Sequence, residues 1–213
     1  MSKLSGSFPK SAPGLPRGRT SLDPRDATAQ QRSRLLRAVV SAVADEGYQA
    51  TTITDIVQRA RVSRSVMYRE FEGKLDCFLA AIESGRELIT ARIAEAMAAV
   101  SDGSLETVVR AMSRAYLESC AREPDHARAW ILELAAAGPE GVEARDRYLD
   151  GFATLMRDID CGYGSGHPRP REHYVALVGG ITELVGREVR AGAAAALPRL
   201  EDALTMAAVA MLR

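Results

Sequence analysis

The side chains with the clearest chemical use in this 213-residue chain lie between Thr51 and Lys74, in the stretch TTITDIVQRARVSRSVMYREFEGK. Arg64, Ser65 and Val66 follow one another within it. A guanidinium can bond both acceptors of a guanine edge, a serine hydroxyl can bond either kind of base edge, and a valine can contact a thymine methyl group. We therefore predict that these three residues read base edges in the major groove of DNA.

A second group in the same stretch carries hydroxyl and ammonium groups, which suit contacts to phosphates. Such contacts fix the register of a protein on DNA without reading its sequence. The predicted DNA-binding surface is completed by Thr52, Thr54, Ser63, Tyr68 and Lys74. Lys74 lies at the start of a predicted helix, where a phosphate is well bound and an ammonium group would reinforce it. A solvated surface lysine is the alternative interpretation.

Two short helices must position these side chains. Thr52 is a good N-cap, and Asp55 three residues later completes a capping box. The apolar residues behind the cap recur at i, i+3, i+4 and i+7, which places them on one helix face. Ser63 caps a second helix whose Met67 and Phe71 point inward. The pattern predicts a helix-turn-helix, whose second helix fits the roughly 12 Å wide major groove.

Residues 34–79 resemble the DNA-binding domain of the TetR family of bacterial one-component transcriptional regulators. The matching residues are the Gly47-Tyr48 step, the Thr51-Thr52 pair, Ile56-Val57, Val62-Ser63, Tyr68, Phe71 and Lys74. The resemblance implies an all-helical dimer with a three-helix DNA-binding head and a larger ligand-sensing body, and it assigns Lys74 to the DNA backbone. The chain departs from the family at Arg61, where glycine is usual. A non-glycine residue in a left-handed turn costs about 1 kcal/mol.

The charge is divided between the two ends of the chain. Residues 1–75 hold 13 basic and 7 acidic residues, whereas residues 76–213 hold 15 basic and 21 acidic ones, so the net charge of zero hides a dipole. A basic head on an acidic body is typical of a protein with one end on phosphates.

The chain divides into three predicted parts. Residues 1–26 form an arm rich in Pro, Gly and Ser, in which Arg17 and Arg19 could enter a minor groove; a flexible, unbound tail is the alternative. Residues 27–73 form the head, with a first helix over residues 27–46. Residues 74–213 form a helical effector-binding and dimerisation domain.

Helical periodicity continues through this third part, and no stretch has a strand pattern, so the fold class is all-α with about nine helices. The predicted helices cover residues 75 to about 100, 104–123, 125–137, 140–159, 172–191 and 198–212. Residues 160–171, rich in Gly and Pro, are interpreted as a flexible connector. The family resemblance implies that the last two helices form a four-helix bundle with a second subunit; ordinary core helices are the alternative.

The body supplies apolar and aromatic side chains for an effector pocket. The predicted lining is Phe78, Ile82, Met112, Tyr116, Trp130, Glu133, Tyr148, Phe152 and Met156, with Glu133 as a polar partner one helical turn from Trp130. Such a pocket indicates a small apolar or aromatic effector, which would shift the population away from the DNA-competent state.

Other function classes have less support. Three scattered cysteines without a C-x-x-C pair indicate reduced thiols and the cytoplasm, and no apolar run is long enough to span a bilayer. His126, His167 and His173 are too dispersed for a metal site, so neither catalytic residues nor a cofactor are predicted. Together with the family resemblance, which implies a ligand-sensing dimer and repression as the common mode, the sequence predicts a ligand-responsive repressor that binds a palindromic operator. A helical small-molecule-binding protein or enzyme and a sequence-indifferent DNA-binding protein remain as alternatives.

Overall fold

The computed structural model describes residues 4–6, 24–100 and 103–213, and every regular element in these ranges is helical, which confirms the all-α prediction. The α-helices are α1 (Pro24–Glu46), α2 (Ile53–Ala60), α3 (Arg64–Glu70), α4 (Lys74–Ala98), α5 (Leu105–Arg122), α6 (Pro124–Arg128), α7 (Pro139–Tyr163), α8 (Arg171–Arg190) and α9 (Glu201–Leu212). Within these ranges no helix is both long and apolar enough to cross a membrane.

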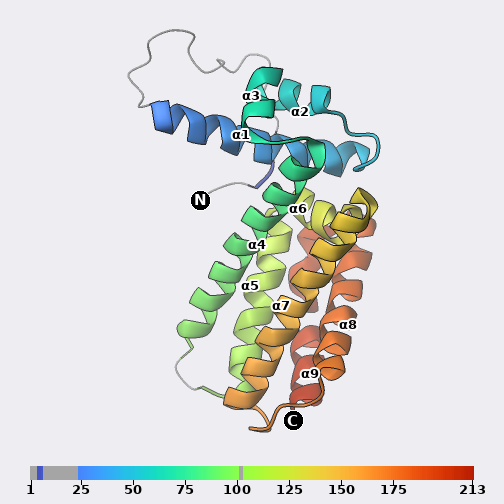
Figure 1. The fold of residues 1–213 in the computed structure, drawn as a ribbon. Helices are drawn as coiled ribbons and strands as arrows, with labels where there is room; N and C mark the ends of the chain where they lie inside the picture. Colours follow the sequence, from blue (N-terminus) through green and yellow to red (C-terminus); the bar gives the residue numbers. More distant parts are fainter. Residues whose placement is uncertain (1–3, 7–23, 101–102) are drawn as a thin grey trace.

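The helices form a head and a body (Figure 1). The helix α1 lies across one end of the molecule with α2 and α3 beside it, and α4 runs from this head into a bundle with α5, α7, α8 and α9. One buried apolar cluster fills the body. The other fills the head and continues into the body through Phe78, Ile82, Trp130 and Tyr148. The head is therefore packed on the body through shared side chains, while the predicted boundary at residue 73 stays a prediction.

The turn between α2 and α3 has the predicted left-handed residue. Arg61 has φ 56° and ψ 44°, and its N–H donates to the carbonyl oxygens at the end of α2. The chain therefore forms this turn with an arginine where glycine would be unstrained.

The segment predicted as one helix over residues 125–137 is not a regular α-helix. It begins as α6, continues as a π-helical turn, η1 (Ala129–Glu133), and ends as a 3-10 turn, η2 (Ala135–Ala137). Gly138, with φ 95°, then allows the chain to turn into α7, where a residue with a β-carbon would be strained.

The prediction of a flexible connector over residues 160–171 is wrong for residues 160–163, which belong to α7. The helix α7 extends to Tyr163, and the buried Asp160 carboxylate accepts hydrogen bonds from Ser165, Arg169 and Tyr174. Burial alone would raise the pKa of Asp160, but these hydrogen bonds outweigh it and hold the pKa at about 2. One ionised side chain thus fixes the turn that the Gly-rich sequence suggested was loose.

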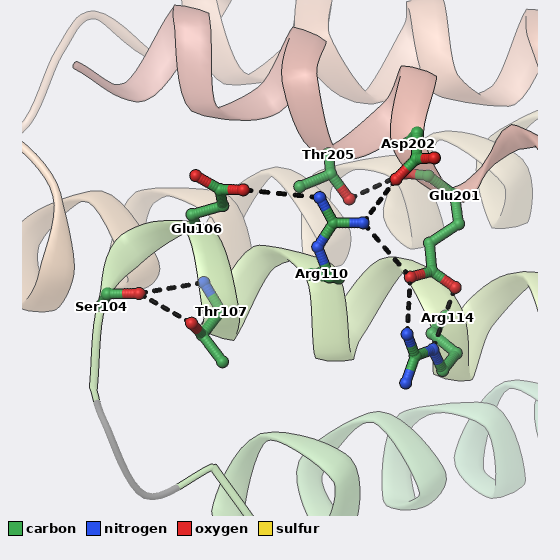
Figure 2. A network of polar contacts seen from close by, with 8 residues as sticks. All are labelled: Ser104, Glu106, Thr107, Arg110, Arg114, Glu201, Asp202 and Thr205. Atoms are coloured by element: carbon green, nitrogen blue, oxygen red, sulfur yellow. Dashed lines mark hydrogen bonds and ion pairs between the residues drawn. The ribbon is translucent and has the colours of Figure 1, made fainter.

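The last α-helix begins at Glu201 rather than Pro198, after a 3-10 segment, η3 (Ala194–Leu200). Figure 2 shows how its first turn is held on α5. Arg114 donates two hydrogen bonds to the Glu201 carboxylate, at 2.9 and 2.8 Å, and Arg110 lies 2.5 Å from Asp202. The two carboxylates also lie at the positive end of the α9 dipole, so this network fixes the start of α9.

Part of the N-terminal arm lies against the folded chain. The Leu4 N–H donates to the Glu123 carboxylate at 3.1 Å, the Gly6 N–H donates to the Arg37 carbonyl oxygen, and the Leu4 side chain is buried. Arg17 and Arg19, the predicted minor-groove residues, lie outside the described residues.

Candidate DNA interface and effector cavity

The helix α2 begins with the predicted capping box. The Thr52 hydroxyl accepts from the Asp55 N–H at 3.3 Å, and the Asp55 carboxylate accepts from the Thr52 N–H at 2.8 Å. The Thr52 hydroxyl also donates to the Asp55 carboxylate at 2.6 Å, and this bond, together with the one from the Thr52 N–H, lowers the pKa of Asp55. Ser63 caps α3 in the same way by accepting from the Val66 N–H at 3.3 Å. Both helices of the motif therefore have defined starts.

The outer side of α3 carries the predicted base-reading residues. Met67 and Phe71 are buried, which leaves Arg64, Ser65 and Tyr68 exposed, the Tyr68 side chain at 56 %. Val66 is half-buried and packs against the head cluster. Less of its side chain is therefore available to contact a thymine methyl group than at a fully exposed position. The polar face predicted from the sequence is thus present on α3.

Arg64 and Thr54 are joined in this structure. The Arg64 guanidinium donates to the Thr54 hydroxyl at 2.6 Å, so a base reader on α3 is held against a predicted phosphate contact on α2. The two side chains lie on the same side of the head, and this bond uses neither the hydroxyl proton of Thr54 nor the other N–H donors of Arg64.

Lys74 has a second role that the sequence did not indicate. Its ammonium group donates to the carbonyl oxygens of Tyr48 and Thr51, at 2.8 and 2.9 Å, and lies 4.2 Å from the centre of the Tyr48 ring. Burial lowers the pKa of Lys74. The ammonium thus ties α4 to the loop between α1 and α2. An ammonium group has three N–H donors, and two of them are used by these carbonyl oxygens. The predicted phosphate contact, which stays a prediction, would use the third.

An apolar cavity of about 40 Å³ lies inside the body, and we call it the inner cavity. Its lining residues are Ile93, Met112, Ser113, Tyr116, Trp130, Phe152, Met156, Val178, Ile181, Thr182 and Leu204. No charged side chain lines it. Ser113 Oγ is buried there without a hydrogen-bond partner.

A second, smaller cavity, which we call the upper cavity, shares Tyr116, Trp130 and Phe152 with the inner cavity. It is further lined by Ile82, Arg86, Ile89, His126 and Tyr148. The His126 ring is fully enclosed, its Nε2 has no hydrogen-bond partner, and burial lowers its pKa to about 4, so the ring is neutral at pH 7.

A wider opening between α4 and α7, which we call the outer groove, has a volume of about 360 Å³. Its lining residues are Glu83, Arg86, Thr90, Ile93, Arg147, Tyr148, Gly151, Phe152 and Leu155. Arg86 pairs with Glu83, and burial together with Glu83 raises the pKa of Tyr148 to about 12. Arg86, Tyr148 and Phe152 also line the upper cavity, so charge lies at the mouth and apolar surface inside.

Seven of the nine predicted pocket residues line these cavities. The exceptions are Phe78, which packs on the Tyr48 ring in the head cluster, and Glu133, which accepts a hydrogen bond from the Tyr48 N–H. Further lining residues that were not predicted include Ser113, His126 and the α8 residues Val178, Ile181 and Thr182. The α8 residues recur at helical spacing, but their apolar pattern was interpreted only as core or dimer surface.

Comparison with known proteins identifies the head. Residues 35–81 match the family model described as bacterial regulatory proteins, tetR family. The head of this chain is a TetR-family DNA-binding domain. The match covers the helix-turn-helix and the first two turns of α4, the elements that carry the predicted DNA contacts and Lys74.

Two TetR-family relatives come from Mycolicibacterium smegmatis. The transcriptional activator FasR is 32 % identical over 79 residues, 37 % of this chain and 35 % of FasR, so the match spans about a third of that relative's length. The transcriptional repressor KstR is 26 % identical over 158 residues, 72 % of each chain.

Solved structures share the fold over most of the chain. The fatty acid degradation regulator FadR from Bacillus halodurans superposes with a TM-score of 0.76 at 18 % identity, covering 89 % of this chain and 97 % of FadR. FadR from Bacillus subtilis, solved in complex with stearoyl-CoA, gives a TM-score of 0.72 at 18 % identity, with 83 % and 96 % covered.

Proposed function

We propose that this protein is a ligand-responsive transcriptional repressor of the TetR family that binds a palindromic operator as a dimer. The observation that carries the proposal is the head itself, in which α3 presents Arg64, Ser65 and Tyr68 outward while α4 connects it to a body containing an apolar cavity. Among the relatives, the repressor KstR matches over most of the chain, body included, which favours repression over activation.

On DNA, Arg64, Ser65 and Val66 read base edges from α3. The residues Thr52, Thr54, Ser63, Tyr68 and Lys74 hold the surrounding phosphates and fix the register. Repeating these contacts in successive major grooves requires two heads about 34–36 Å apart, which is one turn of duplex.

The second head comes from a second copy of the chain, joined through α8 and α9. These helices expose Leu184 at 39 % and Met206 at 71 %, and an apolar groove runs between them. Gly179 and Gly180 on α8 face open space, which allows the backbone of another helix to approach closely. An apolar patch of this kind on a DNA-binding body suits a self-complementary interface.

The effector is an amphiphile with a long apolar chain and an anionic head, of which a long-chain acyl-CoA is the example bound by one FadR structure. The uncharged inner cavity suits the chain, and Arg86 and Arg147 at the outer groove suit the head. Ligand pockets usually measure about 300–1,000 Å³, so the inner cavity must widen to admit a chain.

Fluorescence anisotropy tests the proposal, with a labelled duplex selected by the purified protein from random sequence. Stearoyl-CoA should weaken binding to that duplex by about 5–150-fold, the usual range of allosteric coupling. CoA without an acyl chain is the control and should have little effect. If no duplex is selected over random DNA, sequence-specific regulation is wrong. If a duplex is selected but stearoyl-CoA leaves its affinity unchanged, the acyl-CoA assignment is wrong.

Activity as a sequence-indifferent DNA-binding protein would give equal affinity for selected and scrambled duplexes in that experiment. Among the described residues, no group of three or more His, Cys, Asp or Glu residues could hold a metal ion. A regulator of chromosomal genes would act in the cytoplasm, and the proposed mechanism requires no cofactor.

A further inference from the structure

The segment from α6 to η2 (residues 124–137) touches the cavities, α4 and the head. Near its start, His126 contacts α4 at two points: it bonds the backbone of Ile82, and its Nε2 fills the space beside Gly85. A single short segment is therefore in contact with the helix that leads to the head and with the upper cavity.

In the middle of the segment, Trp130 lies at the junction of the inner and upper cavities and lines both. Its ring packs on Tyr148, with the ring centres 5.7 Å apart. An occupant that extends from the upper cavity into the inner cavity would contact Trp130. Since the inner cavity is only about 40 Å³, such an occupant must also displace the side chains around it.

At its end, the segment is bonded to the head. The Tyr48 N–H donates to the Glu133 carboxylate at 3.0 Å, and the Gln49 side-chain amide donates to the Ala136 carbonyl oxygen at 2.6 Å. Tyr48 is also the residue whose carbonyl oxygen and ring hold Lys74. The loop before the helix-turn-helix is thus attached both to α4 and to the segment that carries Trp130.

The π-helical turn, Ala129–Glu133, contains both Trp130 and Glu133. A π-helical turn inside a helix has poorer intrinsic stability than an α-helical one and is often found at functional sites. A change between π and α hydrogen bonding would rotate Glu133 relative to Trp130. Displacement of the Trp130 ring could in this way alter the hydrogen bond between Glu133 and the Tyr48 N–H in the head.

We propose that the Glu133 carboxylate, through its hydrogen bond to the Tyr48 N–H, is the connection by which occupancy at Trp130 and DNA binding at the head influence each other. This inference rests on the proposed function, because it assumes a head that binds an operator. It goes beyond that function by assigning the coupling to the segment of residues 124–137 and to one hydrogen bond.

The test uses the reciprocity of coupling: if a ligand near Trp130 affects the head, DNA at the head must affect Trp130. Trp130 is the single tryptophan of the chain, so its emission and its acrylamide quenching report this site directly. The quenching constant is measured on the full-length protein with and without unlabelled selected duplex, and anisotropy of a labelled duplex measures affinity in parallel.

In the wild type, the duplex should change the quenching constant of Trp130. The Glu133→Ala variant should still bind the duplex but lose that change, whereas Glu133→Gln, which keeps an acceptor for the Tyr48 N–H, should retain it. Glu133→Asp, which is too short to reach Tyr48 but keeps the charge, should behave as Glu133→Ala and replaces it if the alanine variant does not fold. The half-buried Glu118, which pairs with Arg122 on α5, provides the matched control Glu118→Ala.

The inference is overturned if Glu133→Ala and Glu133→Asp transmit the full change. It is also overturned if wild-type protein binds the duplex with no change at Trp130, a result that leaves the proposed function intact. If the wild type binds no duplex selectively in the anisotropy measurement, the proposed function is wrong, and this inference is wrong with it.

Discussion

The Nε2 atom of His126 lies 1.8 Å from the point that a β-carbon on Gly85 would occupy. Both residues are buried, His126 at the start of α6 and Gly85 at the start of the fourth turn of α4. The imidazole therefore occupies a notch that exists only because residue 85 has no side chain.

Replacing Gly85 by alanine should destabilise the protein by about 1–3 kcal/mol, because the enclosed His126 ring has to move out of its position. Urea unfolding followed by circular dichroism measures the effect. Gly151 in α7 is the matched control, since a β-carbon there meets nothing within 4 Å. Gly151→Ala should stabilise by about 0.5–1 kcal/mol through helix propensity. Equal effects of the two substitutions on the free energy of unfolding would contradict the claim that the His126 ring occupies the space beside Gly85.

The stability of the protein should fall as the pH drops from about 6.5 to about 4. Burial lowers the pKa of His126 to about 4, so below pH 6.5 the unfolded chain takes up a proton that the folded chain does not. The free energy of unfolding should thereby lose about 2 kcal/mol at pH 5 and about 3 kcal/mol in total. Urea midpoints of the wild type and of His126→Gln, measured at pH 7 and pH 5, isolate this contribution. A wild type with the same pH dependence as the variant would contradict the buried neutral ring.

Asp160→Asn should cost about 2–4 kcal/mol, because it removes the charge that pairs with Arg169 at a buried site. The pKa of Asp160 is lowered to about 2. Its contribution is therefore present above pH 4 and is lost as the pH falls from about 4 to about 2. The neighbouring exposed Asp158 gives the control Asp158→Asn, which should change stability by less than about 0.5 kcal/mol. Thermal unfolding at pH 7 distinguishes the two, and a similar small effect for both would mean that the connector is not fixed by Asp160.

Leu184→Glu should convert a dimer to a monomer and weaken operator binding, because it places a charge in the proposed interface on α8. Analytical ultracentrifugation measures the molecular mass directly. Val142 on α7 is exposed to a similar degree, 44 % against 39 %, and Val142→Glu should leave the dimer intact. A wild type that sediments as a monomer would exclude the proposed dimer.

The head was predictable because each of its features depends on residues close together in the chain. The capping box of Thr52 and Asp55 and the left-handed Arg61 are local, and the structure has both. The cavity lining was partly predictable for a related reason. Large apolar residues at helical spacing point into a bundle whichever helices they face, and Met112, Tyr116 and Phe152 line the inner cavity.

The remaining features depend on long-range contacts or on breaks in helical regularity. In a continuous α-helix Glu133 would share a face with Trp130, but the π-helical turn rotates it toward the head, where Tyr48 binds it. Asp160 occurs in a Gly-rich stretch, and its partners Arg169 and Tyr174 become neighbours only when α8 folds back. Isolated polar residues such as Ser113 and His126 carry no periodic signal that would place them in a cavity.

The most direct test of the account is the ratio of affinities for the selected operator and for a scrambled duplex of equal length, at one salt concentration. The protein should prefer the operator by about 1,000-fold or more. Arg64→Ala should lose about 1–3 kcal/mol of operator binding and relax the preference at one base pair in each half-site, while Arg157→Ala on the far part of α7 should not. Equal affinity of the wild type for both duplexes would contradict the claim that this chain reads DNA sequence.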